Sequence, residues 1–186
     1  MSYISSYLDQ LSQILQSLDQ AQIAQIIRVL RQARAEGRRI YTMGNGGSAA
    51  TASHLANDLL KSTVIEGQPR MRVISLADSI PVMLAYANDD GYETIFSQQL
   101  DALAEPGDLL IAISGSGRSP NIIQALDLAR QRGMTTIGLT ARDGGDMVAR
   151  CDICLVAPCQ LMEQIEDVHM VLSHLIYAAI RDQAEV

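Results

Sequence analysis

Positively charged residues are scarce in this sequence. Lys and Arg together number 14 against 21 Asp and Glu residues, which gives a formal net charge of -7. A protein that grips the phosphates of a nucleic acid needs a basic surface, so this balance argues against direct nucleic-acid binding. A chain of 186 residues, 48% of them hydrophobic, predicts one domain over residues 1–186 with a sizeable core.

Long apolar runs and a cysteine framework are absent from the sequence as well. No run reaches the roughly 20 apolar residues that a membrane helix needs, and the N-terminus has no basic segment followed by an apolar one. The three cysteines are odd in number and fall in one short segment, which does not suit a disulfide framework. We therefore expect a cytoplasmic protein that does not associate with membranes.

Two of the cysteines, Cys151 and Cys154, have the C-x-x-C spacing that some zinc sites use. They flank the start of a short predicted strand, in which residues three apart point to opposite faces. We therefore expect these thiols to pack in the core and not to share a metal ion.

Helical spacing of apolar residues appears near both ends of the chain. Asp19 is placed to cap a second helix and Gly37 to end it. We expect residues 1–37 to form a helical extension used in assembly. A last long helix is predicted over residues 160–183, with an apolar side wide enough to be buried in the core or against another subunit. The residues with this spacing are Leu8, Leu11, Ile14, Leu15, Leu18, Ile23, Ile26, Ile27, Leu30, Leu161, Ile165, Val168, Leu172, Leu175, Ile176 and Ile180.

From residue 39 onward, short apolar runs alternate with amphipathic stretches. Such runs predict parallel strands covered on both faces, because each parallel crossover needs a helix. The fold class is therefore α/β, with a doubly wound, mainly parallel five-stranded sheet flanked by helices. The expected strands cover residues 39–44, 72–77, 108–114, 135–141 and 153–158.

Two of these strands end in loops rich in glycine and serine. The first loop covers residues 44–48 (GNGGS), and the second covers residues 114–121 (SGSGRSPN). At such strand ends, helix N-termini present free N–H groups and the positive end of a dipole, which attract an anion. Ser119 is also a natural N-cap, with Pro120 at the first helical position.

Either loop alone is equally well explained as an ordinary strand-to-helix turn, since Gly and Ser are common there. Two such loops in one sheet favour an anion site. Neither has the G-x-x-x-x-G-K-[ST] pattern of a nucleotide triphosphatase, and the first lacks the G-x-G-x-x-G spacing of a dinucleotide site. We therefore expect no nucleotide cofactor and a small phosphorylated metabolite as the ligand.

The order of motifs along the chain resembles the sugar isomerase (SIS) domain family, over nearly its whole length. The resemblance implies the SIS fold and, for the subfamily that acts on heptose phosphates, conversion of sedoheptulose 7-phosphate to glycero-manno-heptose 7-phosphate. The related proteins are homotetramers with sites shared between subunits, which implies a homotetramer here. The motifs are GNGGS at 44–48, H-x-x-x-D at 54–58, AND at 87–89, ISGSGRS at 113–119, LTxxDGG at 139–145, EDVH at 166–169 and a late His.

The resemblance also implies roles for individual residues. Asp58 stands where the isomerases have a catalytic Glu, and His174 matches their late His, so these two are the catalytic candidates. Glu166 stands at a family Gln and is expected to line the substrate. The residues implied in sugar contacts are Asn45, Gly46, Gly47, Ser48, Asn88 and Asp89, and those implied in holding the phosphate are Ser114, Gly115, Ser116 and Ser119.

A carboxylate and a histidine suit this chemistry, because aldose–ketose isomerisation needs a base at carbon and an acid near the oxygens. His54 and Asp58 are spaced i,i+4 and point to one helix face. His174 lies roughly 80° around the last helix from Glu166, and we expect the two to converge. Together, His54, Asp58, Glu166 and His174 offer a nitrogen and oxygen set that suits one zinc ion per subunit. We expect His169 to be structural or at the pocket rim.

Other interpretations of these residues stay open. His174 on an apolar helix also fits a packed core histidine, and Asp58 also fits a solvated helix residue. The subfamily includes an adaptor that binds the replication initiator DnaA, for which the shorter carboxylate of Asp58 would mark lost chemistry; the late His174 favours an enzyme instead. A third alternative is a binding module for another sugar phosphate.

Overall fold

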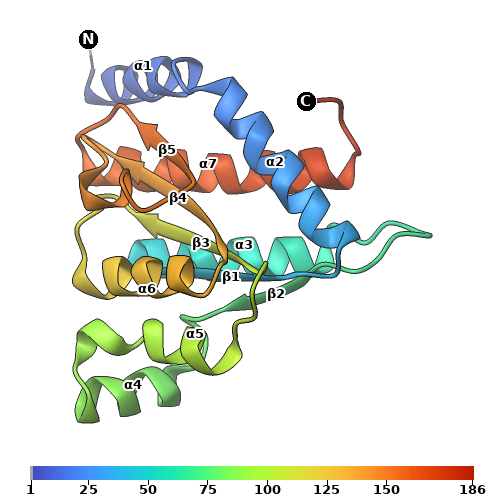
Figure 1. Ribbon diagram of the computed structural model, residues 1–186. Helices are drawn as coiled ribbons and strands as arrows, with labels where there is room; N and C mark the ends of the chain where they lie inside the picture. The colour runs from blue at the N-terminus through green and yellow to red at the C-terminus, as the bar shows by residue number, and fades with distance from the viewer. Residues whose placement is uncertain (1) are drawn as a thin grey trace.

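A parallel sheet forms the centre of the molecule. In the computed structural model, which describes residues 2–186, all five strands are parallel and follow the order β2-β1-β3-β4-β5 (Figure 1). This confirms the predicted doubly wound sheet flanked by helices. The strands are β1 (Arg39–Gly44), β2 (Arg72–Ser75), β3 (Leu109–Ser114), β4 (Thr135–Ala141) and β5 (Ile153–Ala157).

Helices connect the strands and cover both faces of the sheet. No helix among the described residues is long and apolar enough to cross a membrane. The α-helices are α1 (Tyr3–Gln16), α2 (Gln20–Ala35), α3 (Gly47–Lys61), α4 (Ile80–Asp89), α5 (Ser97–Leu103), α6 (Pro120–Gln131) and α7 (Met162–Arg181), with short 3₁₀ turns at Tyr92–Thr94 and Gly145–Met147.

Strand β2 is shorter than the sequence predicts. It was expected over residues 72–77 but ends at Ser75. The Leu76 N–H still donates to the Thr42 carbonyl at 2.9 Å, and the chain then turns toward α4, which has Pro81 in its first turn. The Asp78 N–H donates to the Ser75 carbonyl at 3.3 Å, in a turn that takes the chain out of the sheet two residues early.

The strand order places a switch point between β1 and β3. The chain winds outward from β1 to β2 on one side, and from β3 to β4 and β5 on the other. Ligands of open parallel sheets bind beyond the carboxyl ends of the strands at such a point. The two glycine- and serine-rich loops follow β1 and β3, so both flank the switch point.

Side chains of the strands alternate between two hydrophobic clusters, one on each face. On β1, Ile40 packs with α2, α3 and α7, whereas Tyr41 packs with α5 and α6. Because successive strand residues point to opposite faces, a strand buried on both sides has to be apolar throughout, which explains the continuous runs in the sequence. In Figure 1, α1, α2 and α7 lie in the upper part of the view and α4 and α5 at the bottom.

The two N-terminal helices differ in how they join the domain. Asp19 caps α2 as predicted, accepting from Ala21 N at 2.9 Å, and Ile26 and Leu30 of α2 are buried in the core. The side chains of α1 are exposed or half-buried, and Tyr7 donates to Asp167 of α7 at 2.5 Å. Residues 20–35 are therefore part of the core, whereas α1 lies outside it. The assembly role of residues 1–37 stays a prediction.

The expected orientation of Cys151 and Cys154 is wrong. An ideal Cβ on Gly138 of β4 would lie 2.8 Å from the Cys151 Sγ and 3.1 Å from the Cys154 Sγ, so both sulfur atoms lie next to Gly138 on the same face of the sheet. Cys151 precedes β5, and the Cys151 N–H donates to the Met147 carbonyl at 3.0 Å. Residues three apart point to opposite faces only when both lie in the strand, and here only Cys154 does.

His169 of α7 is buried against β4. Its side chain is 1% exposed, and its Nε2 lies 3.3 Å from the Thr140 carbonyl oxygen. Burial lowers the pKa of His169, because the protonated imidazole loses its hydration. The histidine is therefore a neutral core residue, in keeping with the structural role expected for it.

This burial predicts a loss of stability in mild acid. Below the unfolded-state pKa of about 6.5, the unfolded chain takes up a proton that folded His169 resists, so stability falls with pH, by at most about 1.4 kcal/mol per pH unit for one group. Above that pH the penalty is absent. We expect the Tm to drop further between pH 7.5 and pH 5.5 in the wild type than in His169→Gln. Equal drops in differential scanning calorimetry would contradict this assignment.

Candidate active site

The first loop turns sharply from β1 into α3. Gly46 has a φ of +54°, in the left-handed region that favours glycine, and it is the N-cap of α3. A Cβ on Gly44 would lie 2.5 Å from the backbone of Ser48, so this close approach also requires glycine. Asn45 and Ser48 are half-buried, and Gly46 and Gly47 are exposed. The loop therefore opens the N-terminus of α3 toward solvent, where N–H groups can receive an anion.

Glu166 reaches from α7 to the start of α3. A Cβ on Gly47 would lie 2.1 Å from the Glu166 Oε1, so the carboxylate lies directly against this glycine. The side chain is half-buried. Glu166 therefore borders the first loop and offers hydrogen-bond acceptors there.

The second loop is folded onto the loop that follows β4. Gly117 has a φ of +62°, and its carbonyl accepts from the Asp146 N–H at 2.9 Å. A Cβ on Gly117 would lie 2.1 Å from the Gly144 carbonyl oxygen, so a side chain has no room here. Ser114 is buried, and its hydroxyl accepts from the Gly117 N–H at 3.2 Å. The loop after β4, which contains the DGG motif, therefore packs against the second loop and holds it in place.

The serine side chains of the second loop lie at the start of α6. Ser119 is the N-cap, as predicted, but within the described residues its hydroxyl makes no capping hydrogen bond. The Ser116 hydroxyl accepts from the Arg118 N–H at 3.3 Å, and both Ser116 and Ser119 are half-buried. Gly115 is buried near Ile165 of α7. Two hydroxyl groups therefore stand at a helix N-terminus with access to solvent.

One ion pair accompanies this loop. The exposed Arg118 guanidinium donates to Asp143 at 3.0 Å. This partner and the Gly145 N–H lower the pKa of Asp143 to about 2. The pair links the second loop to the loop after β4 at the protein surface.

Asn45 is held by two residues that the sequence did not single out. The side-chain amides of Asn45 and Asn121 exchange two hydrogen bonds, at 2.9 and 2.8 Å, and Tyr92 donates to Asn45 at 2.9 Å. Asn121 belongs to α6 and is 1% exposed. The amide pair therefore joins the first loop to the start of α6. Asn121 ends the second loop motif, but only the folded chain shows its partner.

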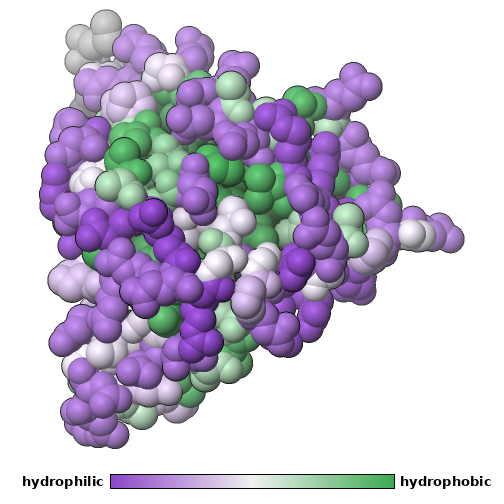
Figure 2. Space-filling model, viewed as in Figure 1, coloured by the Kyte–Doolittle hydropathy of each residue, from purple (hydrophilic) through white to green (hydrophobic). Residues whose placement is uncertain are grey.

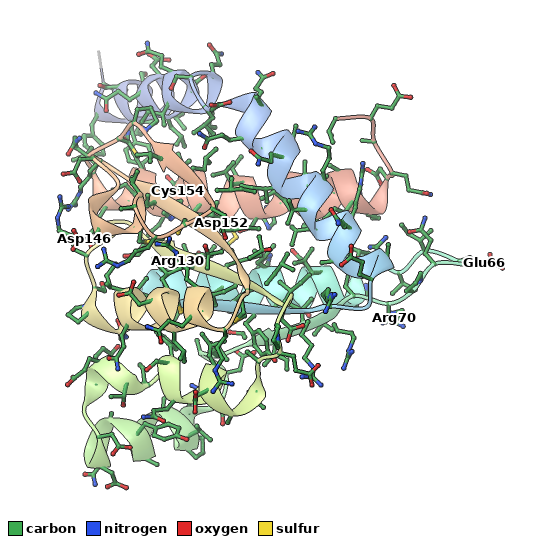
Figure 3. The ribbon with its side chains drawn as sticks, viewed as in Figure 1. Glu66, Arg70, Arg130, Asp146, Asp152 and Cys154 are labelled. Atoms are coloured by element: carbon green, nitrogen blue, oxygen red, sulfur yellow. The ribbon has the colours of Figure 1, made fainter. Side chains whose placement is uncertain are left out.

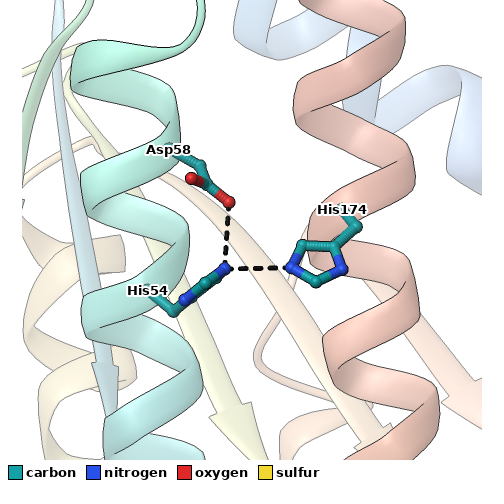
Figure 4. A group of neighbouring side chains, drawn as sticks. All are labelled: His54, Asp58 and His174. Atoms are coloured by element: carbon teal, nitrogen blue, oxygen red, sulfur yellow. Dashed lines mark hydrogen bonds and ion pairs between the residues drawn. The ribbon is translucent and has the colours of Figure 1, made fainter.

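Three ionisable side chains meet between α3 and α7. The His54 Nε2 lies 2.9 Å from the His174 Nε2 and 3.1 Å from the Asp58 Oδ2 (Figure 4). The potential ligand atoms of the three residues lie within 4.8 Å of one another. Asp58 is buried, whereas His54 and His174 are exposed. His174 is therefore not a packed core histidine, and Asp58 is not a solvated helix residue.

Glu166 lies outside this group. The sequence groups it with His54, Asp58 and His174, but the structure places it against Gly47. The reason is the distance along the helix axis. Glu166 and His174 are only about 80° apart around α7, but eight residues separate them, which is a rise of about 12 Å. The four predicted ligands are thus divided between the three-residue group and the first loop.

Asn88 and Asp89 lie at the end of α4. Both are exposed, and Asn88 donates to Asp89 at 2.7 Å. The preceding turn of α4 shares a small pocket with the first loop, which includes Ala87, Leu84 and Asn45. The two residues are therefore one turn or less from a wall of this pocket.

Comparisons with known proteins agree with this architecture. Residues 2–141 match the SIS domain family. The chain is 44% identical over 140 residues to the phosphoheptose isomerase of Trichlorobacter lovleyi, covering 75% of this chain and 71% of that protein. It is 41% identical over 142 residues to the phosphoheptose isomerase of Nitratidesulfovibrio vulgaris, covering 76% and 68%.

Solved structures extend the likeness to the whole fold. The structure of phosphoheptose isomerase GmhA from Neisseria gonorrhoeae aligns with a TM-score of 0.87 at 28% identity, over 96% of this chain and 97% of that one. That of a phosphoheptose isomerase from Francisella tularensis aligns with a TM-score of 0.89 at 28% identity, over 96% of both chains. The chain therefore belongs to the SIS domain family. Within that family, it is an enzyme of the isomerase class.

Proposed function

We propose that the protein interconverts sedoheptulose 7-phosphate and glycero-manno-heptose 7-phosphate. The observation that carries this proposal is the meeting of His54, Asp58 and His174 on α3 and α7, the two helices that border the first loop at the switch point. The 44% identity to a phosphoheptose isomerase supports the choice of a seven-carbon substrate. The phosphate is received by Ser114, Gly115, Ser116 and Ser119 and by the N-terminus of α6, which needs no basic surface. A net charge of -7 is therefore compatible with this ligand.

The reaction moves a hydrogen from C1 to C2 and the carbonyl from C2 to C1. In the proposed chemistry, the Asp58 carboxylate takes a proton from C1 while His174 protonates O2, which gives an enediol. A proton then returns to C2, and the O1 proton leaves to His174. Glu166, Asn45 and the exposed N–H groups of the first loop bind the sugar hydroxyls, with Asn88 and Asp89 at the edge of the pocket.

The three-residue group also suits a metal ion. Within the described residues, the buried Asp58 Oδ2 accepts no hydrogen bond, although the His54 Nε2 lies 3.1 Å from it, and two imidazole Nε2 atoms face each other at 2.9 Å. Two nitrogens and one carboxylate oxygen are typical ligands of catalytic zinc, which keeps a further position open. In this alternative use of the same residues, a zinc ion bound by His54, Asp58 and His174 would polarise the substrate carbonyl in place of direct proton transfer by Asp58 and His174.

We propose that the protein is a cytoplasmic homotetramer. Large apolar side chains are exposed on two helices: Tyr3 (82%), Ile4 (70%) and Leu8 (59%) on α1, and Ile80 (59%) and Leu84 (64%) on α4. Figure 2 shows hydrophobic residues among polar ones in the upper part of this face, where α1, α2 and β5 lie in Figure 1. Such surfaces favour association, which would also cover the exposed His54 and His174. A monomeric mass in light scattering at micromolar concentration would contradict this assembly.

The amide pair predicts a specific defect in substrate binding. We expect Asn121→Ala to raise the KM for sedoheptulose 7-phosphate by about tenfold, because Asn45 loses two hydrogen bonds worth about 0.5–1.5 kcal/mol each and with them its fixed orientation. The kcat should change less, since the group of His54, Asp58 and His174 is untouched. Tyr92→Phe removes one hydrogen bond of the same amide and serves as the milder control. Equal KM values in the wild type and Asn121→Ala would show that Asn45 does not need this partner.

Incubation with sedoheptulose 7-phosphate in deuterated water tests the proposed activity. We expect the aldose product with solvent deuterium at C2, followed by NMR, because the proton is carried by a side chain that exchanges with solvent. Parallel samples with added zinc and with a chelator measure the contribution of a metal. Absence of product and of deuterium at C1 and C2 in all samples would refute the proposal. Stoichiometric capture of DnaA in place of turnover would favour the adaptor function.

A further inference from the structure

Cys151 and Cys154 form a pair of thiols that lies outside the candidate active site. Both sulfurs lie over Gly138 of β4, at 2.8 and 3.1 Å from the position of its absent Cβ. Gly138 is the register partner of Cys154, so the missing side chain leaves the room in which the two thiols meet. Both cysteines are half-buried, so each side chain keeps part of its surface in contact with solvent.

The two thiols differ in acidity. A hydrogen bond from the Cys151 thiol lowers the pKa of Cys154, because it stabilises the thiolate. The same hydrogen bond and burial raise the pKa of Cys151, with the Arg130 guanidinium partly offsetting that increase. In Figure 3, Arg130, Asp152 and Cys154 are labelled in the same region of the molecule. Because the thiolate is the reactive form and the hydrogen bond favours it on Cys154, we assign the role of nucleophile to Cys154.

Cys159 provides an internal comparison. It is 4% exposed, and burial raises its pKa. Its backbone N–H donates to the Ala157 carbonyl at 2.8 Å, in the turn that follows β5. One chain therefore carries a half-buried thiol pair and a buried single thiol that should be inert.

We propose that Cys151 and Cys154 are a site of reversible oxidation by hydroperoxides. The Cys154 thiolate attacks the terminal peroxide oxygen, so an S–O bond forms, the O–O bond breaks and the leaving alkoxide or hydroxide takes up a proton. The Cys151 sulfur then attacks the Cys154 sulfenic acid, so a disulfide forms and water leaves with the Cys151 proton. Two thiols lose two electrons in total, and the peroxide is reduced. A dithiol reductant restores the pair by exchange.

Peptide mass spectrometry on the full-length protein tests this proposal. The reduced protein is treated with hydrogen peroxide at pH 7, and the remaining thiols are alkylated. We expect a Cys151–Cys154 disulfide, reversed by dithiothreitol, while Cys159 stays reduced. Without peroxide, iodoacetamide should modify Cys154 at least tenfold faster than Cys159.

Single substitutions separate the two roles. In Cys151→Ser the Cys154 sulfenic acid should accumulate and react with dimedone, because the resolving thiol is gone. Cys154→Ser should show no early oxidation, and Cys159→Ser should behave as the wild type. Circular dichroism and Tm confirm that each variant is folded. The proposal is overturned if Cys159 oxidises as fast as Cys154, or if Cys151→Ser yields the same products as the wild type.

Discussion

Replacing His174 by alanine lowers kcat for sedoheptulose 7-phosphate by about 10²–10⁴-fold, the range typical of a lost general acid or base. The loss follows from geometry, since His174 is the only member of the group that α7 contributes, and its Nε2 lies 2.9 Å from the His54 Nε2. The side chain is exposed in the single chain, so its removal leaves no cavity in the core of the domain and the fold should keep its Tm within a few degrees. Coupled assays of aldose formation measure the effect.

A matched control for this substitution lies on the same helix. His169→Gln changes the other histidine of α7, which is buried against Thr140 and is absent from the three-residue group. We expect it to alter the pH dependence of stability while kcat stays within about threefold of the wild type, because it leaves the acid and base groups in place. Activity that survives His174→Ala would show that another residue handles the proton at oxygen.

The second large effect concerns stability. Gly117→Ala should destabilise the protein by more than about 2 kcal/mol, because the left-handed conformation costs about 1–2 kcal/mol and the new Cβ meets backbone that cannot yield. That Cβ would lie 2.1 Å from the Gly144 carbonyl oxygen. The second loop and the loop after β4 would have to move apart, so phosphate binding should weaken in the protein that remains folded.

Gly133→Ala isolates the steric part of this effect. Gly133 has a similar φ of +71°, but its Cβ would meet only the Pro106 side chain at 4.0 Å. We expect the free energy of unfolding of this control to fall by only about 1–2 kcal/mol, which is the cost of the left-handed conformation. Chemical denaturation of both variants gives the comparison. Equal destabilisation would mean that the loop after β4 gives way and does not fix Gly117.

The sequence predicted the scaffold well because each element carries a local signal. Continuous apolar runs indicated strands buried on both faces, and Asp19 and Ser119 marked helix starts that the structure confirms. The i,i+4 spacing of His54 and Asp58 placed both on one helix face, and the structure joins them with His174. These features depend only on residues that are close together in the sequence, or on the periodicity of a single helix.

The features that sequence reasoning missed depend on how separate elements meet. Asn45 and Asn121 pair only because β1 and β3 are neighbours in the sheet, an order that no local pattern states. Angular position on α7 groups Glu166 with His174, but the axial rise between them places Glu166 against Gly47 instead. The thiols of Cys151 and Cys154 meet because a bend precedes β5, and the alternation of side chains along a strand does not extend across a bend.

A crystal structure of the protein soaked with sedoheptulose 7-phosphate tests the assignment of Asp58 and His174 as the catalytic group. We expect the phosphate at Ser114, Ser116 and Ser119, with C1 and C2 of the sugar facing Asp58 and His174 in the assembled protein. A sugar whose C1 and C2 lie away from both residues, while the phosphate occupies the second loop, would contradict the assignment of the catalytic group.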